Sequence, residues 1–336
     1  MRVMHRITAR VGIILITIIV TGMTVWGSLA IYYSDLPGQT LRVCSAGLFG
    51  LGILCAFIIL PNRRRTVVLF LAVFAALVAW WSSIEPSNNR DWQDNLAVLP
   101  YATIQGDLVT LHNIRNFNYR TETDFDPRYY DKTFDINKLN SVDLITSYWM
   151  GDAIAHVMFS FGFGGSDYVT FSIETRKEKT EAYSTIKGFF KQYELIYVVG
   201  DERDLIRLRT NYRNDDVYLY RIRAVPERMR RLFVEYIKKI NTLKETPEFY
   251  NTLTTNCTTN VIAHIKAFGG DARYNWKILL SGYAPKYAYE LDKLDTSLPF
   301  EELRKRSYIN KRAHEVGNDQ NFSLKIREGL PTPNPQ

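Results

Sequence analysis

The chain has 336 residues, of which 46% are hydrophobic and 23% charged, and its formal net charge is +7. That length suits about two domains. The average composition conceals a sharp division, because residues 11–84 are almost wholly apolar, whereas the remainder has the balance of a globular domain large enough to bury a core. Part of the positive charge lies beside the apolar segments, so it does not indicate nucleic-acid binding, and we expect no nucleic-acid partner.

Three apolar runs open the chain, at Val11–Tyr33, Val43–Leu60 and Thr66–Ile84. Each is close to the roughly 20 residues that cross a bilayer as a helix. The first is too long for a signal-peptide core and lacks a small-residue cleavage site, so we expect it to be retained. The sequence therefore predicts a three-helix transmembrane anchor over residues 1–84, in which Cys44 and Cys55 are small apolar residues.

Arginines near the spans predict the orientation of the anchor. Arg2, Arg6 and Arg10 precede the first span, and Arg63–Arg65 lie between the second and third, whereas the turn 34–42 carries one arginine. Because positive residues are retained on the cytoplasmic side, the N-terminus is expected in the cytoplasm. Everything after the third span is then expected on the outer face of the membrane.

Beyond the anchor, the sequence predicts a linker at 85–100, an α+β domain at 101–325 and a disordered tail at 326–336. Strands are expected before helices for the most part, which favours an antiparallel sheet over a doubly wound fold. Alternation predicts strands at 102–111, 154–163, 167–175, 193–199 and 216–224. Longer periods predict helices at 226–244, where Pro226 suits the first turn, and at 257–268 and 284–293.

One β-hairpin can be predicted with its register. Two alternating segments, 155–163 and 168–176, flank a glycine-rich turn at 164–167. The register that pairs Phe159 with Phe171 matches every apolar residue with an apolar partner. A slip of one residue would set apolar side chains against polar ones, so the matched register is expected.

The same register places His156 directly across from Glu174 on the polar face of the hairpin. Side chains at such positions have Cβ atoms about 5 Å apart, so the carboxylate can reach the imidazole. A base that is oriented by a carboxylate is the supporting half of a catalytic triad. The alternative is an ordinary surface ion pair, and Asp152 and Arg176 are rival partners for the histidine.

Cys257 is the one cysteine outside the apolar runs, in a domain expected in an oxidising compartment, and it has no disulfide partner within that domain. It follows Thr255 and Asn256, either of which can cap a helix. A thiol in the first turn of a helix has a lowered pKa, and the free N–H groups there can hold an oxyanion. We therefore expect Cys257 to be a nucleophile with His156 as its base; a buried structural thiol is the alternative.

The other histidines of the domain are weaker candidates. His264 lies about two helical turns (~10 Å) from Cys257, too far for direct proton transfer, and His112 is expected in the core or in a loop. The chain shows no histidine pair or His–Cys spacing typical of a metal site. We expect neither a metal nor a cofactor.

Several segments resemble the family of the periplasmic, N-terminal domain of the bacterial lipoprotein intramolecular transacylase, which is related to permuted papain-like thiol enzymes. The resemblance covers most of 100–310 and implies a fold in which an antiparallel sheet carries the histidine and a helix N-terminus carries the cysteine. It implies that Cys257 is the nucleophile and His156 the base. In that transacylase the main membrane part follows the domain, whereas here three spans precede it. The resemblance is carried by segments 154–163, 172–176 and 256–260, with 109–119, 194–210 and 276–283.

Together these features predict a membrane-anchored cysteine acyltransferase or acyl hydrolase that acts on acyl esters of membrane lipids or lipoproteins through an acyl-thioester. One alternative is a cell-wall amidase or peptidase on the same scaffold. Another is a non-catalytic envelope binding module, in which Arg203, Arg207, Arg209 and Arg213 contact anionic headgroups; a solvated face is the simpler account of these arginines. The acyl donor, the acceptor and the oligomeric state have no signal in the sequence.

Overall fold

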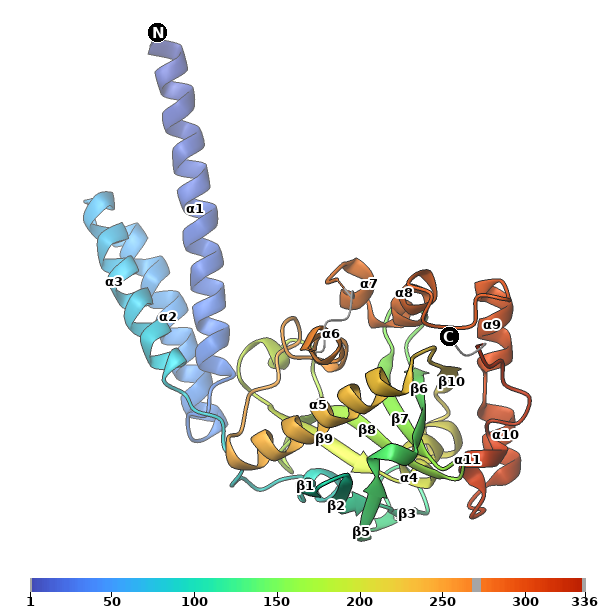
Figure 1. Ribbon diagram of the computed structural model, residues 1–336. Coiled ribbons are helices and arrows are strands. Elements are labelled where there is room, and N and C mark those ends of the chain that lie inside the picture. The colour runs from blue at the N-terminus through green and yellow to red at the C-terminus, as the bar shows by residue number, and fades with distance from the viewer. Residues whose placement is uncertain (1, 268–272, 334–336) are drawn as a thin grey trace. The chain divides into compact units, whose positions relative to one another are not determined.

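The computed structural model describes residues 2–267 and 273–333, and it divides into two compact units (Figure 1). The first comprises residues 1–86 and 184–193 and is called the anchor unit. The second comprises 87–183 and 194–336 and is called the sheet unit. Each unit is described by itself.

The anchor unit contains the three predicted apolar helices. They are α1 (Arg2–Tyr32), α2 (Gln39–Ile59) and α3 (Arg63–Ser82). Each holds 20 or more consecutive residues with the length and hydropathy of a membrane span. Many large apolar side chains on these helices are exposed, as expected for surfaces that face lipid rather than water.

Close contacts hold the three helices of the anchor unit together. A Cβ at Gly27 would lie 2.7 Å from side-chain atoms of both Phe49 and Leu77, so this position lets neighbouring helices approach each other. The segment 184–193 also belongs to this unit. Its Lys191 Nζ donates hydrogen bonds to three carbonyl groups at the end of α3, including that of Trp81 at 3.1 Å, which is a favourable contact for a cation at a helix C-terminus.

The sheet unit is built on an eight-stranded sheet. Seven strands follow the order β1-β2-β9-β8-β7-β6-β10, and β5 pairs with β2. The prediction of an antiparallel sheet is wrong at one place, because β2 and β9 pair in parallel and make the sheet mixed. The strands are β1 (Tyr101–Gln105), β2 (Leu108–Arg115), β5 (Tyr129–Asp135), β6 (Leu139–Tyr148), β7 (His156–Phe163), β8 (Asp167–Arg176), β9 (Glu194–Gly200) and β10 (Asp216–Arg221); β3 (Asn118–Tyr119) and β4 (Phe125–Asp126) form a separate pair.

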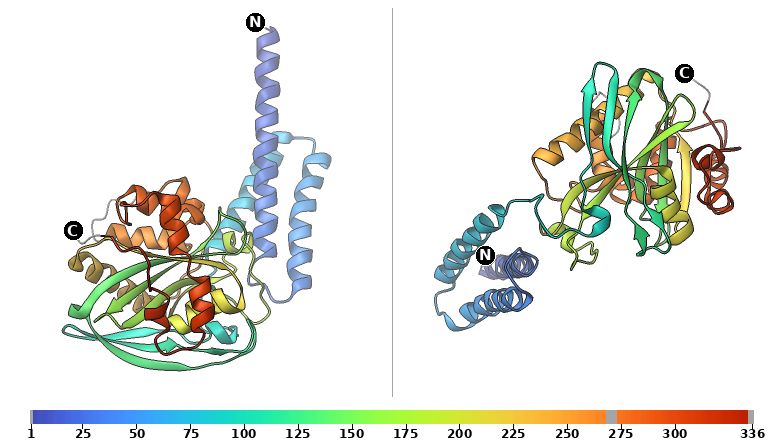
Figure 2. Two further views of the ribbon diagram at one scale, coloured as in Figure 1. Left: turned by 90° about the vertical axis from the view of Figure 1, so that its right-hand side faces the viewer. Right: turned by 90° about the horizontal axis from the view of Figure 1, so that it is seen from below.

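Helices cover both faces of this sheet (Figure 2). The long helix α5 (Pro226–Glu245) packs Phe233 against Phe161 and Phe163, and α6 (Cys257–Ala267) lies on the same face. The opposite face packs against α4 (Glu202–Arg207) and the C-terminal helices. These are α10 (Asn310–Val316) and α11 (Phe322–Lys325); the remaining helices are α7 (Trp276–Leu279), α8 (Ala284–Glu290) and α9 (Phe300–Ser307).

The expected linker and tail differ from the structure. Within 85–100, Trp92 and Leu96 are buried, and Leu96 belongs to the core of the sheet unit. Within 326–336, Ile326 is fully buried in the same core, and residues 334–336 lie outside the described part of the chain. Apolar side chains in both segments therefore extend the folded domain on either side of the predicted limits.

A buried ion cluster fastens the C-terminal helices to the sheet. The Arg327 guanidinium donates to Asp143 of β6 and to Glu202 of α4, with Nη2 2.8 Å and 2.6 Å from the two carboxylates. Both carboxylates are fully buried. Arg221 binds Asp143 as well, and Ser160 donates to Glu202, so each buried carboxylate has at least two donors, as burial of charge requires.

Candidate active site

The predicted hairpin register is confirmed. Phe159 pairs with Phe171 and Phe161 with Val169. His156 is the first residue of β7, and its Nε2 lies 3.2 Å from a carboxylate oxygen of Glu174 on β8. The structure thus brings together the histidine and the carboxylate that the register predicted.

Two further polar side chains surround this pair, and neither was predicted. The Ser172 hydroxyl lies 2.6 Å from His156 Nε2 and donates to Glu174 over 2.6 Å. Arg209 Nη2 donates to the same carboxylate oxygen over 2.7 Å. Glu174 therefore accepts from a serine and an arginine as well as from the imidazole, which fixes the orientation of all three side chains.

The position of Ser172 in the site could have been predicted from the hairpin register. It lies two residues before Glu174 on the same strand, so both side chains point to one face of the sheet. Arg209 had no comparable signal, because it comes from a π-helix (η4, Leu208–Tyr212) that continues α4. Such π-helical turns are rare and occur frequently at functional sites.

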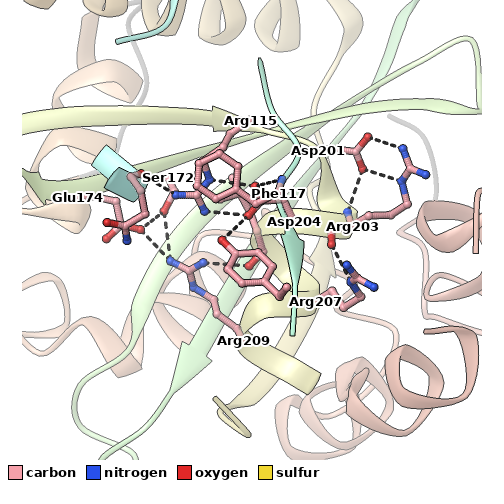
Figure 3. A network of polar contacts seen from close by, with 12 residues as sticks. Arg115, Phe117, Ser172, Glu174, Asp201, Arg203, Asp204, Arg207 and Arg209 are labelled. Atoms are coloured by element: carbon pink, nitrogen blue, oxygen red, sulfur yellow. Dashed lines mark hydrogen bonds and ion pairs between the residues drawn. The ribbon is translucent and has the colours of Figure 1, made fainter. Parts of the chain in front are cut away.

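A buried ion pair holds α4, and thereby the π-helix, against the sheet. Asp204 of α4 accepts two hydrogen bonds from the Arg115 guanidinium, at 2.8 Å and 2.9 Å. It also accepts from the backbone N–H of Phe117 and the hydroxyl of Tyr119. Figure 3 shows this network beside the contacts of Arg209 with Glu174 and Ser172. Four donors on one carboxylate leave α4 little freedom to shift.

Cys257 is the first residue of α6, and Asn256 is the residue that caps the helix. The Asn256 side-chain oxygen accepts from the backbone N–H of Thr259 over 2.9 Å. In return, the Thr259 hydroxyl accepts from the backbone N–H of Asn256 over 2.9 Å. This reciprocal arrangement resembles a capping box, with threonine in place of glutamate, and it places the thiol at the positive end of the helix dipole.

The Cys257 thiol lies within hydrogen-bonding reach of the His156 side chain. Since His156 Nε2 is occupied by Ser172 and Glu174, Nδ1 is the ring nitrogen available to the sulfur. Burial raises the pKa of Cys257, but the hydrogen bond and charge of His156, with the backbone N–H of Val157, outweigh it and lower the pKa below its ordinary value. These interactions favour the thiolate over the neutral thiol.

The pKa values of His156 and Glu174 are also shifted in favour of the charged forms of these groups. Burial lowers the pKa of His156, but the charge of Glu174, with the hydrogen bonds to Cys257 and Glu174, raises it to about 9. Burial also raises the pKa of Glu174, but His156, Arg209 and Ser172 bring it well below its ordinary value. The three shifts thus favour the charged forms of these groups, with a thiolate, an imidazolium and a carboxylate in sequence.

The segment before β7 is fixed from a distant part of the chain. The backbone N–H of Ala155 donates to the Ser281 hydroxyl, and the N–H of Gly282 donates to the carbonyl of Ala153, both over 3.0 Å. A Cβ at Gly282 would lie 2.0 Å from the Asp152 carbonyl oxygen. A glycine is thus required at 282 for the approach that sets the position of His156.

The rival partners of His156 point elsewhere. Asp152 forms an ion pair with Arg304. Arg176 is buried, where it donates to the carbonyls of Leu96 and Ala97 and stacks over Trp92. Neither of them contacts the imidazole.

Two of the four arginines expected on a solvated face are buried, so that expectation is wrong for Arg207 and Arg209. Arg207 and Arg209 are buried, Arg203 is paired with Asp201, and Arg213 is paired with Glu122. The lining of a surface for anionic headgroups would need free guanidinium groups. Within the described residues, Arg207 and Arg209 make internal contacts, whereas Arg213 is exposed and pairs with Glu122 at the surface.

The other histidines of the sheet unit lie apart from Cys257. His264 is buried and accepts from or donates to the Tyr197 hydroxyl over 2.8 Å. Burial lowers the pKa of His264 to about 4, so it stays neutral. His112 lies at the surface of β2 between Asp131 and Thr103.

Residues 125–282 match the family model of the Lnb N-terminal periplasmic domain. This is the family that the sequence resembles, and the matched range includes His156, Glu174 and Cys257. No curated protein and no solved structure matches the chain.

Proposed function

Because residues 125–282 carry the Lnb N-terminal periplasmic domain, we propose that this chain is a membrane-anchored cysteine acyltransferase or acyl hydrolase of the bacterial envelope. The observation that carries the proposal is the pairing of the Cys257 thiol with His156, which lowers the thiol pKa and goes with a histidine pKa raised to about 9. A thiolate is the nucleophilic form of cysteine, and three helices of the same chain are long and apolar enough to cross a membrane.

In the first step, the Cys257 thiolate attacks the carbonyl carbon of an acyl ester, and a carbon–sulfur bond forms. The ester C–O bond then breaks, and the leaving alkoxide takes a proton from the His156 imidazolium. The products are an acyl-thioester on Cys257 and a free alcohol. His156 is now neutral, and Glu174 still accepts its Nε2 proton.

In the second step, neutral His156 takes a proton from an acceptor amine or from water, which attacks the thioester. Collapse of the intermediate releases the amide or the acid and returns the thiolate and the imidazolium. An amine acceptor makes the enzyme a transferase and water makes it a hydrolase. The same groups act as acid and base in turn, as in other thiol enzymes.

The start of α6 supplies candidate donors for the oxyanion. Asn256 satisfies the N–H of Thr259, whereas the backbone N–H groups of Cys257 and Thr258 have no acceptor among the residues that the structure describes. Free N–H groups at a helix N-terminus stabilise negative charge that develops on the carbonyl oxygen. Their position next to the sulfur suits a tetrahedral intermediate.

The proposal is tested by trapping the acyl-enzyme. The full-length protein in lipid nanodiscs, with Cys44→Ala and Cys55→Ala so that Cys257 is the only thiol, is mixed with a short-chain acyl ester and quenched in acid. Mass spectrometry should find the acyl mass on the peptide that contains Cys257, and His156→Ala should reduce its rate of formation by at least about a hundredfold.

His112→Ala serves as the matched control, because it removes a histidine outside the site and should leave acylation unchanged. A folded protein that forms no adduct on Cys257, or one that forms it equally fast without His156, would contradict the proposal. Release of peptide fragments from purified peptidoglycan, without lipid deacylation, would support an amidase or peptidase instead.

A further inference from the structure

A mostly apolar cavity of about 310 Å³ lies between the sheet and the helices α5, α6 and α8. This volume falls within the range of about 300–1,000 Å³ that is typical of small-molecule pockets. The apolar wall comes from β6 and β7 on one side and from the helices on the other. It includes Leu144, Phe159, Leu232, Val261 and Ile265.

The cavity begins beside the candidate nucleophile. Val157 and Thr258, which line it, directly follow His156 and Cys257 in the chain. The backbone N–H of Val157 lies close enough to the Cys257 sulfur to lower the pKa of the thiol. An acyl group on that sulfur would therefore have an apolar space next to its carbonyl.

The cavity has a limited length, and its far end is cationic. Along β6 and β7 it extends from Val157 to Val142, which is paired with Phe161. Four strand residues span about 13 Å at roughly 3.3 Å each. Beyond Val142 the lining includes Arg223, Arg228 and Lys293.

The apolar part of the cavity ends at these three cationic side chains. Arg223 is paired with Asp292, whereas Arg228 and Lys293 have no ion-pair partner among the described residues, and Arg228 is exposed. Burying a methylene chain against unpaired, hydrated charges is unfavourable. A chain longer than the apolar part would have to displace them or bend back.

We propose that this cavity binds the acyl chain of the substrate and selects linear chains of medium length, with decanoyl better accommodated than hexadecanoyl. The inference rests on the proposed function, because it takes Cys257 as the acylated residue. The chain would lie along β7 from the thioester towards Val142. Its methylenes would replace water at apolar side chains, which is the main source of affinity for such ligands.

The test measures Cys257 acylation with a homologous series of p-nitrophenyl esters, from butanoyl to hexadecanoyl, in the nanodisc protein with Cys257 as its only thiol. The initial rate should be highest near decanoyl and at least tenfold lower for hexadecanoyl. Ile265→Trp, which fills the cavity from α6, should slow decanoyl at least tenfold and leave butanoyl within about twofold. Ala263→Trp is the control, since Ala263 is exposed on the same helix and does not line the cavity.

Binding without catalysis separates this inference from the proposed function. A decanoyl amide with a dansyl group on its nitrogen should bind to the Cys257→Ala protein, and Ile265→Trp in that background should abolish the fluorescence change. If amide binding follows these expectations but no thioester forms, the cavity assignment stands and the catalytic proposal fails. If acylation occurs with rates independent of chain length, or if Ile265→Trp slows butanoyl and decanoyl equally, the cavity assignment is overturned.

Discussion

At the scale of single residues, the candidate site depends on how three titratable groups share charge. Glu174 is half-buried beside Ser172, Arg209 and His156, and its charge is the largest influence that raises the pKa of His156. The imidazolium in turn is the largest influence that lowers the pKa of Cys257. A substitution of Glu174 should therefore change the pKa of the Cys257 thiol measurably.

Alkylation of Cys257 should report its lowered pKa. In the Cys44→Ala, Cys55→Ala protein, we expect iodoacetamide to reach half its limiting rate below pH 8.5, the midpoint of an ordinary thiol. His156→Ala should move that midpoint upward, because burial then acts on the thiol without a compensating cation. Equal midpoints in the two proteins would show that the imidazolium does not stabilise the thiolate.

Acyl transfer from an alkyl ester should lose rate as His156 loses its proton. The leaving alkoxide needs that proton, so the rate should fall around pH 9, where the pKa of His156 lies. Glu174→Gln removes the charge that raises this pKa and should shift the fall to lower pH. Ser172→Ala keeps the charge and should leave the fall within about half a pH unit; an identical shift in both variants would assign the effect to hydrogen bonding instead.

The raised pKa of His156 also predicts how the free energy of unfolding changes with pH. His156 has a folded pKa of about 9, above its ordinary value of 6.5. Its contribution to the free energy of unfolding is thus fully present below about pH 6.5 and is lost as the pH rises through 9. Mild alkali should weaken the site and the fold around it together.

At the scale of elements, the start of α6 decides where the thiol lies. Asn256→Ala removes the acceptor for the Thr259 N–H and should lower the free energy of unfolding by about 1 kcal/mol. For a domain of this size, that corresponds to a Tm lower by about 2–4 °C, measurable by tryptophan fluorescence in detergent. Asn256→Asp keeps the cap and should retain most of the stability; an unchanged Tm in Asn256→Ala would show that the cap contributes nothing.

The elements that the sequence predicted were those with clear periodicity. Helix α5 and the β7–β8 hairpin occur near the predicted limits because one face of each is apolar and buried. The predicted strand 102–111 is in fact two strands, β1 and β2, which turn at Gly106 with a φ of 60°. A single glycine between polar residues was too short a signal to reveal that hairpin.

Strand β6 was missed because polar residues interrupt its pattern. Asp143, Thr146 and Ser147 are all fully buried, although such residues normally mark an exposed face. Asp143 is paired with Arg221 and Arg327 from distant parts of the chain, and Ser147 donates to Asp215. A residue that is buried through a distant partner cannot be recognised from local alternation.

The candidate site, too, could be predicted from local sequence pattern only in part. The pairing of His156 with Glu174 followed from one hairpin, so local pattern sufficed. Arg209 reaches Glu174 only because Asp204 and Arg115 hold α4 in place across 89 residues of sequence. Its role required the tertiary structure.

At the scale of the whole molecule, the arginines of the anchor unit indicate an orientation in the membrane. Arg63, Arg64 and Arg65 occupy the first turn of α3, where the helix dipole disfavours positive charge. Their presence is better explained by retention on the cytoplasmic side. With three spans, the sheet unit would then lie in the periplasm.

Fusions to alkaline phosphatase, which is active only outside the cytoplasm, test this orientation. We expect a fusion after Asn62 to be inactive and a fusion at the C-terminal end to be active. A fusion to green fluorescent protein at the same two points should give the opposite pattern. Reversed activities would place the sheet unit in the cytoplasm, where lipoprotein acyl groups are not accessible.

The position of Arg327 has a consequence for the order in which the protein is made. Glu202 is fully buried, and Arg327 provides its only ion pair among the described residues. A ribosome completes Glu202 some 125 residues before it reaches that arginine. An emerging chain must keep this carboxylate hydrated, or accept the several kcal/mol that an unpaired buried charge costs. A chain that ends before Arg327 therefore lacks the ion pair of Glu202. This contact can form only when synthesis is nearly complete.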